Sequence, residues 1–167
     1  MADDGLTAAL TTTHAEAIAG FLEGAQVPFG RVAHEAAMSA AAEAHAAGML
    51  PEQVAKTIVL HDGNAYVIAA ITAADRLDMR KLRDLLGSGR RLRFASEEEI
   101  ERDFPSIEVG AVPPFGPMVP AAEVIDSALA AQSQILCPAG DHRHSVLVDP
   151  ADVVRITAAK VADICEE

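Results

Sequence analysis

The sequence predicts a single α+β domain in which helices flank a mixed, mostly antiparallel sheet. Its 167 residues suit one domain that is large enough to bury a core. Half of the residues are hydrophobic but only 4% are aromatic, so we expect an aliphatic core. Short apolar runs bounded by turn residues alternate with segments that carry helix-capping signals, and this mixture predicts strands and helices within one fold.

The first residues predict a tail and a helix. Residues 1–11 are expected to form a loose N-terminal tail, and residues 12–167 the single domain. Thr13-His-Ala-Glu16 fits a capping box, because its hydroxyl and carboxylate can each accept a backbone N–H of the first turn. The helix should run to about Glu23 and end at Gly24.

The next elements predict the start of the sheet. A strand is expected over 27–35, and an alanine-rich helix over 39–47 is stopped by a glycine. A second strand is expected over 55–61 and returns over 65–71. Asp62-Gly63 between them is a strong hairpin signal, because glycine adopts the positive φ that a tight turn requires.

The middle of the chain predicts two more helices. Residues 78–86 carry leucines on one face beside charged residues, which is typical of an amphipathic helix closed by glycine. A short strand is expected over 91–95. Ser96-Glu-Glu-Glu99 is a second capping box, and its helix must end by Pro105.

The C-terminal part predicts three strands and two helical segments. Asp149-Pro150 places a capping side chain before a proline at the first helical position, so a helix should run to about residue 156. We expect a further helical turn or two over 159–165. The strands are expected over 122–126, 134–138 and 144–148.

The formal net charge of −12 argues against a protein that holds a long stretch of nucleic acid by itself, and no DNA partner is expected. One basic concentration could form a small docking patch or simply a solvated face; it comprises Arg80, Lys81, Arg83, Arg90, Arg91 and Arg93. No apolar run approaches the roughly 20 residues of a membrane span, and the N-terminus lacks a signal-peptide pattern. We therefore expect a cytoplasmic protein without a membrane partner. Cys137 and Cys165 predict reduced thiols.

Two segments carry the strongest functional signal. Val54-Ala-Lys56-Thr-Ile-Val-Leu60 is an apolar strand with one lysine near its start, and Gly110-Ala-Val-Pro-Pro-Phe-Gly116 is a glycine and proline loop. A lysine with a loop of backbone donors can hold an ester carbonyl or a phosphate. The lysine could also blunt a strand edge with its head group in water, and the loop could be a rigid turn.

Taken together, in this order and at this separation, the two segments resemble the YbaK/EbsC family, the domain associated with prolyl-tRNA synthetases that hydrolyses mischarged aminoacyl-tRNA. The resemblance covers residues 25–165 and implies an α+β fold of this kind. It implies an aminoacyl-tRNA deacylase that acts on the 3′ end of aminoacyl-tRNA, with a small amino acid and tRNA(Pro) as family precedents. It implies no cofactor, and a synthetase is a further candidate partner.

The resemblance also suggests site residues. Lys56 and Gly110 are the expected catalytic positions, with the glycine backbone close to the ester, and Pro114 completes the same motif. His34 sits where the family places a pocket-lining aromatic or histidine, although it could be an exposed residue at a strand end.

A second loop carries two further substrate-binding candidates, Gly140 and Ser145. The family commonly has Gly-Gly-Lys-Arg-Gly here, whereas this chain has Ala139 at the first glycine and Ser145 where many relatives carry aspartate. His142 and His144 could be surface or pocket residues, and without a third ligand at close spacing they predict no metal site. No G-x-S-x-G motif supports a serine hydrolase.

The resemblance suggests a mechanism with little side-chain acid–base chemistry, because an aminoacyl ester is already activated. Lys56 would anchor the terminal nucleotide or the ester, and N–H groups near Gly110 and Gly140 would hold the carbonyl. The nucleophile would be water, positioned by the neighbouring hydroxyl of the substrate. The alternative function is a non-catalytic module with the same fold that docks on a synthetase or binds a nucleotide.

Overall fold

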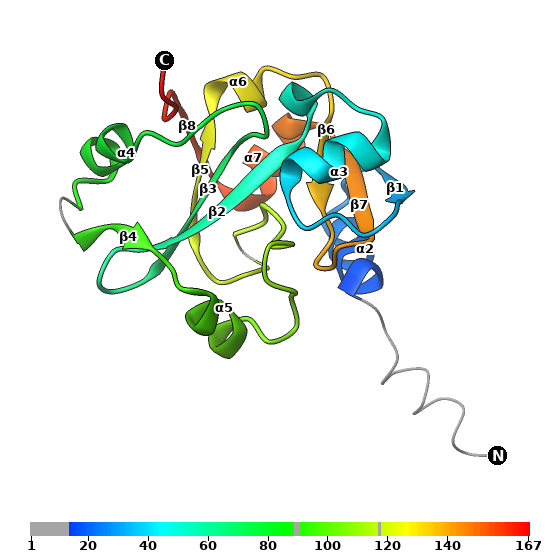
Figure 1. The fold of residues 1–167 in the computed structure, drawn as a ribbon, viewed down its shortest axis with the longest axis horizontal. Helices are drawn as coiled ribbons and strands as arrows, with labels where there is room; N and C mark the ends of the chain where they lie inside the picture. The colour runs from blue at the N-terminus through cyan, green and yellow to red at the C-terminus, as the bar shows by residue number, and fades with distance from the viewer. Residues whose placement is uncertain (1–13, 89–90, 117) are drawn as a thin grey trace.

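The computed structural model describes residues 14–88, 91–116 and 118–167. The tail predicted for residues 1–11, the domain boundary at residue 12 and the capping residue Thr13 lie outside them. Within the described residues the helices and strands form one α+β domain with two sheets (Figure 1), which confirms the predicted fold class.

Within the described residues, seven strands lie close to their predicted positions, and β8 is an eighth that was not predicted. They are β1 (Phe29–Ala33), β2 (Ala55–His61), β3 (Tyr66–Thr72), β4 (Arg93–Phe94), β5 (Ala122–Asp126), β6 (Ile135–Pro138), β7 (His144–Val148) and β8 (Lys160–Ala162). The helices are α2 (His14–Gly24), α3 (Ala40–Ala47), the 3₁₀ helix η1 (Pro51–Gln53), α4 (Met79–Leu86), α5 (Glu97–Asp103), α6 (Ser127–Ala130) and α7 (Pro150–Thr157).

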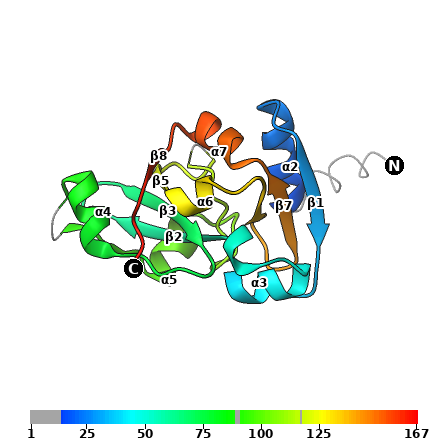
Figure 2. The same ribbon diagram turned by 90° about the horizontal axis from the view of Figure 1, so that it is seen from above.

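The strands divide between two sheets. The smaller has the order β1-β7-β6 and is antiparallel throughout. The larger has the order β4-β2-β3-β5-β8, in which β4, β2 and β3 are antiparallel and the pairs β3–β5 and β5–β8 are parallel. Figure 2 shows the larger sheet on the side of α4 and the smaller sheet on the side of α2.

The two sheets meet at the start of β2. Val54 forms a parallel bridge with Leu136 of β6, and both side chains are fully buried. Ala44 of α3 joins them in a small apolar cluster. Lys56 therefore lies two residues beyond the line along which the sheets are joined.

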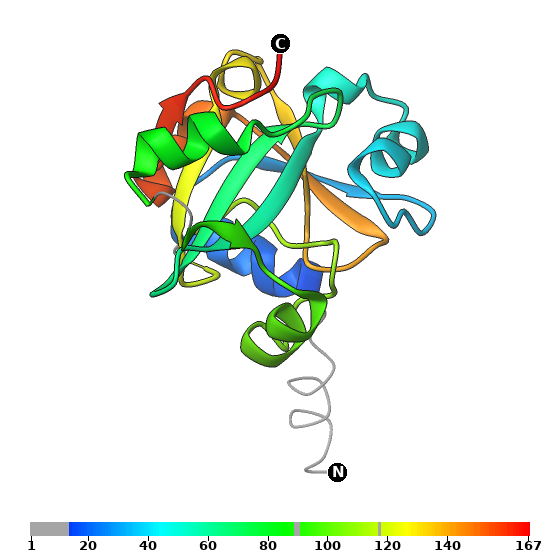
Figure 3. The same cartoon turned by 60° about the vertical axis from the view of Figure 1, so that its left-hand side comes forward.

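Residues that alternate along β2 and β3 enter two different cores, because successive side chains of a strand point to opposite faces. Leu60 and Val67 pack with Leu82 of α4, whereas Val59 and Ile68 pack with Ile100 of α5 and with the segment that follows it. The C-terminal segment runs beside α4 (Figure 3), where Leu77 bridges Cys165 and Lys81 pairs with Asp163.

The predicted helix ends are present in the structure. Gly48 and Gly87 end α3 and α4 in the left-handed conformation, with φ of 66° and 65°. Ser96 and Glu99 form the predicted capping box of α5, and the Asp149 side chain accepts the N–H of Ala151 at the start of α7.

The prediction of a helical turn over 159–165 was wrong. Ala158 adopts a left-handed conformation with φ of 52° and ends α7, and residues 160–162 then form β8. Lys160 and Val161 pair in parallel with Val124 and Ile125 of β5. A three-residue strand has no periodicity of its own, so its conformation is set by the strand beside it.

Gly140 fixes the loop before β7 against α2. Its φ is +88°, and a Cβ atom there would lie 2.7 Å from the Cβ of His14 and 3.3 Å from Ile18. Nδ1 of His14 also contacts the Gly140 carbonyl oxygen at 2.8 Å. The glycine therefore allows a close approach that a side chain would prevent.

We predict that Gly140→Ala lowers the free energy of unfolding by about 1–3 kcal/mol, because it adds backbone strain and a contact that is too short. Gly20→Ala in α2 is the matched control, since a Cβ there meets nothing within 4 Å and alanine favours the helix. Urea denaturation measures both. A Gly140→Ala variant as stable as wild type would contradict this packing.

Candidate functional site

A pocket of about 240 Å³ lies at the junction of the two sheets. Four segments line it: α3 with the residues before it, the start of β2, the loop at Gly110, and the end of β6 at Pro138. The pocket brings together Lys56 and Gly110, which are 54 positions apart in the sequence. It also contains Glu43, an acidic residue that sequence reasoning did not select.

Lys56 projects from β2 with an exposed side chain. It lines the junction pocket and also a neighbouring groove of about 570 Å³ that contains Arg76 and Phe94. Among the described residues it has no hydrogen-bond or ion-pair partner. Its ammonium is therefore available to an anionic or carbonyl group at the point where pocket and groove meet.

Gly110 is exposed at the pocket, with φ of +87°. A Cβ atom at this position would lie 3.4 Å from the ring of His142 and 3.5 Å from the Met38 carbonyl oxygen, so the backbone conformation and the close packing both suit glycine. The Gly110 N–H has no partner within the described part of the chain, since the neighbouring hydrogen bond to the Glu108 carbonyl comes from Ala111.

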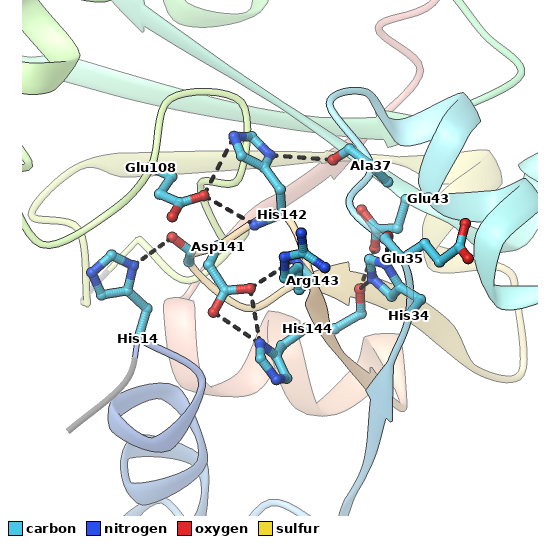
Figure 4. A network of polar contacts seen from close by, with 12 residues as sticks. His14, His34, Glu35, Ala37, Glu43, Glu108, Asp141, His142, Arg143 and His144 are labelled. Atoms are coloured by element: carbon cyan, nitrogen blue, oxygen red, sulfur yellow. Dashed lines mark hydrogen bonds and ion pairs between the residues drawn. The ribbon is translucent and has the colours of Figure 1, made fainter. Parts of the chain in front are cut away.

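A chain of hydrogen bonds links the pocket to the surface through three side chains (Figure 4). The Ser145 hydroxyl donates to Oε1 of Glu43 over 2.9 Å, and Nε2 of His34 lies 2.8 Å from the Ser145 oxygen. Figure 4 labels Glu43 and His34, the two ends of this chain. Nδ1 of His34 lies 2.7 Å from the Glu35 carbonyl oxygen, which can only accept. Ser145 and Glu43 are buried, whereas His34 is half-buried, so the chain leads outwards.

The donors and acceptors of Glu43, Ser145 and His34 permit two arrangements of the same protons. When Glu43 is ionised, Ser145 donates to it and both ring nitrogens of His34 donate. When Glu43 is protonated, it can donate to Ser145, which then donates to the neutral ring of His34. A proton can thus pass between Glu43 and His34 without leaving an unpaired group.

Burial raises the pKa of Glu43 to about 7, and the hydrogen bond from Ser145 opposes this shift in part.

The sequence pattern around Glu43 could have indicated that its side chain is buried. Ala40, Glu43, Ala44 and Ala47 follow the spacing of one helical face, and Ala44 is in the core. The single carboxylate on an otherwise apolar face marks a buried polar group.

The loop before β7 is held by pairs of side chains. His142 lies against Gly110, with Nε2 3.5 Å from the Glu108 carboxylate and Nδ1 3.2 Å from the Ala37 carbonyl oxygen. Nδ1 of His144 contacts the Asp141 carboxylate at 3.0 Å (Figure 4). The two histidines thus have separate carboxylate partners. His142 packs against Gly110 at the junction pocket, whereas His144 lines other cavities.

None of the four predicted substrate-binding residues lines the junction pocket. His34 and Ser145 are connected to it by hydrogen bonds through Glu43, whereas Pro114 and Gly140 are not. Pro114 is buried and lines none of the cavities described here. The Gly140 N–H donates to the Ala111 carbonyl oxygen over 3.1 Å, so this amide is already used within the fold. The structure gives both residues a part in shaping the loops, and we do not retain the Gly140 amide as a substrate donor.

Another cavity, of about 340 Å³, lies between α2, β1 and β7. Arg31, His144 and Ser145 are among its lining residues, and neither Lys56 nor Gly110 reaches it. It touches the hydrogen-bond chain at Ser145, on a different side from the junction pocket.

One set of side chains has the spacing of metal ligands within the described residues. Single ligand atoms of Asp75, Asp126 and Cys165 lie within 4.8 Å of one another. Both oxygens of Asp126 already accept backbone N–H groups, from Ile164 and Ala128, and Asp75 accepts the Thr72 hydroxyl. These contacts explain the cluster as a structural one.

The predicted basic concentration is largely taken up by local contacts. Lys81 pairs with Asp163, Arg93 forms two hydrogen bonds to Glu99, and Arg83 donates to the Leu92 carbonyl oxygen. Arg90 lies outside the described residues. This pattern favours a solvated face of a helix and strand over a docking patch.

Comparison with known families adds a decisive observation to this geometry. Residues 34–156 match the family described as the aminoacyl-tRNA editing domain, and they include Lys56, Gly110 and the whole junction pocket. The chain belongs to the aminoacyl-tRNA editing domain family. The resemblance read from the two sequence segments is thus confirmed.

Solved structures show the same fold. One is a protein proposed to be a trans-editing enzyme for prolyl-tRNA synthetase, with 25% identity, a TM-score of 0.79, and coverage of 92% of this chain and 98% of that chain. Another, from work on computational grafting of epitopes onto scaffold proteins, has 23% identity, a TM-score of 0.81, and coverage of 92% and 97%. No curated protein matches the chain. None of the helices in the described parts of this editing domain is long and apolar enough to cross a membrane.

The editing domain buries another carboxyl with a raised pKa, Glu123 of β5. Neither of its oxygens has a hydrogen-bond partner within the described residues, and burial raises its pKa to about 8. Thr157 and the Gly116 backbone lie close to Glu123 and offset this rise in pKa in part. The Thr157 hydroxyl donates its hydrogen to the Val153 carbonyl oxygen and not to Glu123.

We predict that the domain loses stability as pH rises from about 4.5 towards 8. The pKa values of Glu43 and Glu123 are raised in the folded state, to about 7 and about 8, so the unfolded chain releases these protons first and unfolding becomes easier. Each pKa unit corresponds to about 1.4 kcal/mol. Glu123→Gln should be more stable than wild type at pH 8 and nearly equal at pH 4.5, as measured by urea denaturation. An identical pH profile in the two proteins would contradict this.

Proposed function

We propose that this chain is a trans-editing deacylase that hydrolyses the ester between a small amino acid and the 3′-terminal ribose of tRNA. The observation that carries the proposal is the junction pocket. Around one small volume it places a buried carboxyl together with an ammonium and a backbone N–H that have no partner among the described residues. The family match supports the substrate class, since its domain edits aminoacyl-tRNA. tRNA(Pro) is the candidate tRNA, because the similar structure described above is proposed to serve prolyl-tRNA synthetase.

In the mechanism that we propose, Lys56 anchors the terminal nucleotide or the ester, and the Gly110 N–H donates to the carbonyl oxygen as negative charge develops on it. The nucleophile is water, positioned by the vicinal hydroxyl of the terminal ribose. His34 and Ser145 act on the pocket indirectly, because their hydrogen bonds hold Glu43 in place. Little protein acid–base chemistry is needed, because the aminoacyl ester is an activated ester and orientation supplies much of the acceleration.

The groove beside the pocket is suited to the nucleotides next to the ester. Phe94 is 57% exposed there, and Lys56 and Arg76 line the same groove. An exposed aromatic ring can stack on a base, while the two cations can contact phosphates. Lys56 would then stand between the base in the groove and the ester in the pocket.

The net charge of −12 argues that the tRNA body is delivered by another protein, for which an aminoacyl-tRNA synthetase is our candidate. Editing requires access to charged tRNA, so the compartment that we propose is the cytoplasm. The same charge is the observation that favours the alternative function, a module that docks on a synthetase without turnover. A deacylation assay over a panel of mischarged tRNAs, with and without the synthetase, separates the two.

Lys56→Ala is predicted to lower hydrolysis at least 100-fold, a loss on the order of that for removing one oxyanion donor, with the melting temperature nearly unchanged. The melting temperature should hardly change because Lys56 is exposed and has no partner within the described part of the fold. Lys160→Ala is the matched control, because Lys160 is an exposed strand lysine that lines none of the described cavities. Wild-type turnover by Lys56→Ala would rule out this pocket as the active site.

Substrate assistance predicts that a tRNA whose terminal ribose lacks the vicinal hydroxyl is cleaved far more slowly than normal tRNA. His34, His142 and His144 should each be replaceable by alanine with a loss below about tenfold, whereas loss of a general base costs about 10²–10⁴-fold. Single-turnover rates for both substrates measure this. An inactive histidine variant, together with continued cleavage of the deoxy substrate by wild type, would identify that histidine as the base instead.

A further inference from the structure

Glu43 is the single acidic side chain among the described residues that line the junction pocket. One of its oxygens accepts the Ser145 hydroxyl. The other, Oε2, has no hydrogen-bond partner among the described residues. It is not fully buried, so solvent can reach it. The pocket therefore offers one open carboxylate oxygen to whatever enters it.

In the part of the chain that the structure describes, no cation pairs with this carboxylate. Lys56 lines the same pocket but makes no ion pair with Glu43. The other ionisable groups near it are the buried Cys137 thiol, whose pKa is raised well above its ordinary value by burial and by nearby acids, and His34, which is reached through Ser145. A carboxylate buried without a cation is costly, so an entering cation would be stabilised there.

An aminoacyl ester brings such a cation. Its α-ammonium is attached to the carbon next to the carbonyl, so an ester held at Lys56 and Gly110 places the ammonium within the same pocket of about 240 Å³. We propose that Glu43 binds the α-ammonium of the aminoacyl group, and that the pocket thereby selects esters with a free α-amine. This inference rests on the proposed function and assigns Glu43 a role in specificity.

The hydrogen-bond chain makes the required charge state accessible. When the ammonium arrives, the Glu43 proton can pass through Ser145 to His34, which is half-buried and whose other ring nitrogen faces the Glu35 carbonyl oxygen. In that state the hydrogen-bonding groups of Glu43, Ser145 and His34 all remain paired. The ionised carboxylate then faces the ammonium, and the displaced positive charge lies near the surface.

The test compares two substrates with the same amino acid and tRNA, aminoacyl-tRNA and its N-acetyl derivative, which lacks the ammonium. Each kcat/KM is divided by the spontaneous hydrolysis rate of that substrate, because acetylation also changes ester reactivity. Wild type should prefer the free amine by about 10- to 100-fold, the range for a hydrogen bond between charged groups. Glu43→Gln should bring this preference close to one by slowing the free-amine substrate while leaving the N-acetyl substrate unchanged.

Glu123→Gln is the matched control, because it removes the other buried carboxyl with a raised pKa, which lines none of the described cavities. It should keep the wild-type preference. If Glu43→Gln lowered kcat/KM equally for both substrates, the proposal would be overturned. Glu43 would then act as a proton acceptor or stabilise the structure of the pocket, without recognising the ammonium.

A binding measurement keeps the inference testable apart from turnover. Calorimetry with a non-hydrolysable 3′-aminoacylamino-adenosine, with its α-amine free or acetylated, should show the same preference in wild type and its loss in Glu43→Gln. If no mischarged tRNA is hydrolysed but this preference is present, the proposed function fails and the ammonium site stands. Equal binding of the two analogues by wild type would overturn the ammonium site.

Discussion

The junction between the two sheets is the constraint on which the rest of the site depends. Val54 and Leu136 are fully buried and pair across the junction, and α3 packs over them through Ala44. This arrangement directs the start of β2 past the end of β6 and sets Glu43 beside Lys56. The pocket is consequently a product of long-range packing, and a shift at the junction would move all of its walls together.

The cost of burying Glu43 is the second determinant of the site. A carboxyl placed on the apolar face of α3 must be protonated, hydrogen-bonded or paired with a cation. The Ser145–His34 chain meets this requirement for one oxygen, and the other remains open to the pocket. Glu123 shows the contrasting case, since it lines none of the described cavities and has no hydrogen-bond partner within the described residues. The difference is that Glu43 faces a pocket which a ligand can enter, whereas Glu123 does not.

Much of the fold was predictable because its signals are local. The Asp62-Gly63 turn, the glycines that end α3 and α4, and the capping box at Ser96 each specify a backbone conformation through neighbouring residues. The strand β8 was missed because only its parallel pairing with β5 defines it. The chemistry of their segments draws attention to Lys56 and Gly110, and the family resemblance gives them their expected roles, whereas the sequence around Glu43 predicts only an alanine-rich helix. The hydrogen bond from the Gly140 amide to Ala111 likewise depends on tertiary contacts that no sequence window contains.

The central claim is that the acyl group occupies the junction pocket. A crystal structure of the protein with a non-hydrolysable 3′-aminoacylamino-adenosine tests it most directly. We expect the acyl carbonyl between Lys56 and the Gly110 backbone, and the adenine in the groove beside Phe94. Binding of the acyl group in the cavity between α2, β1 and β7, with the junction pocket empty, would contradict the account.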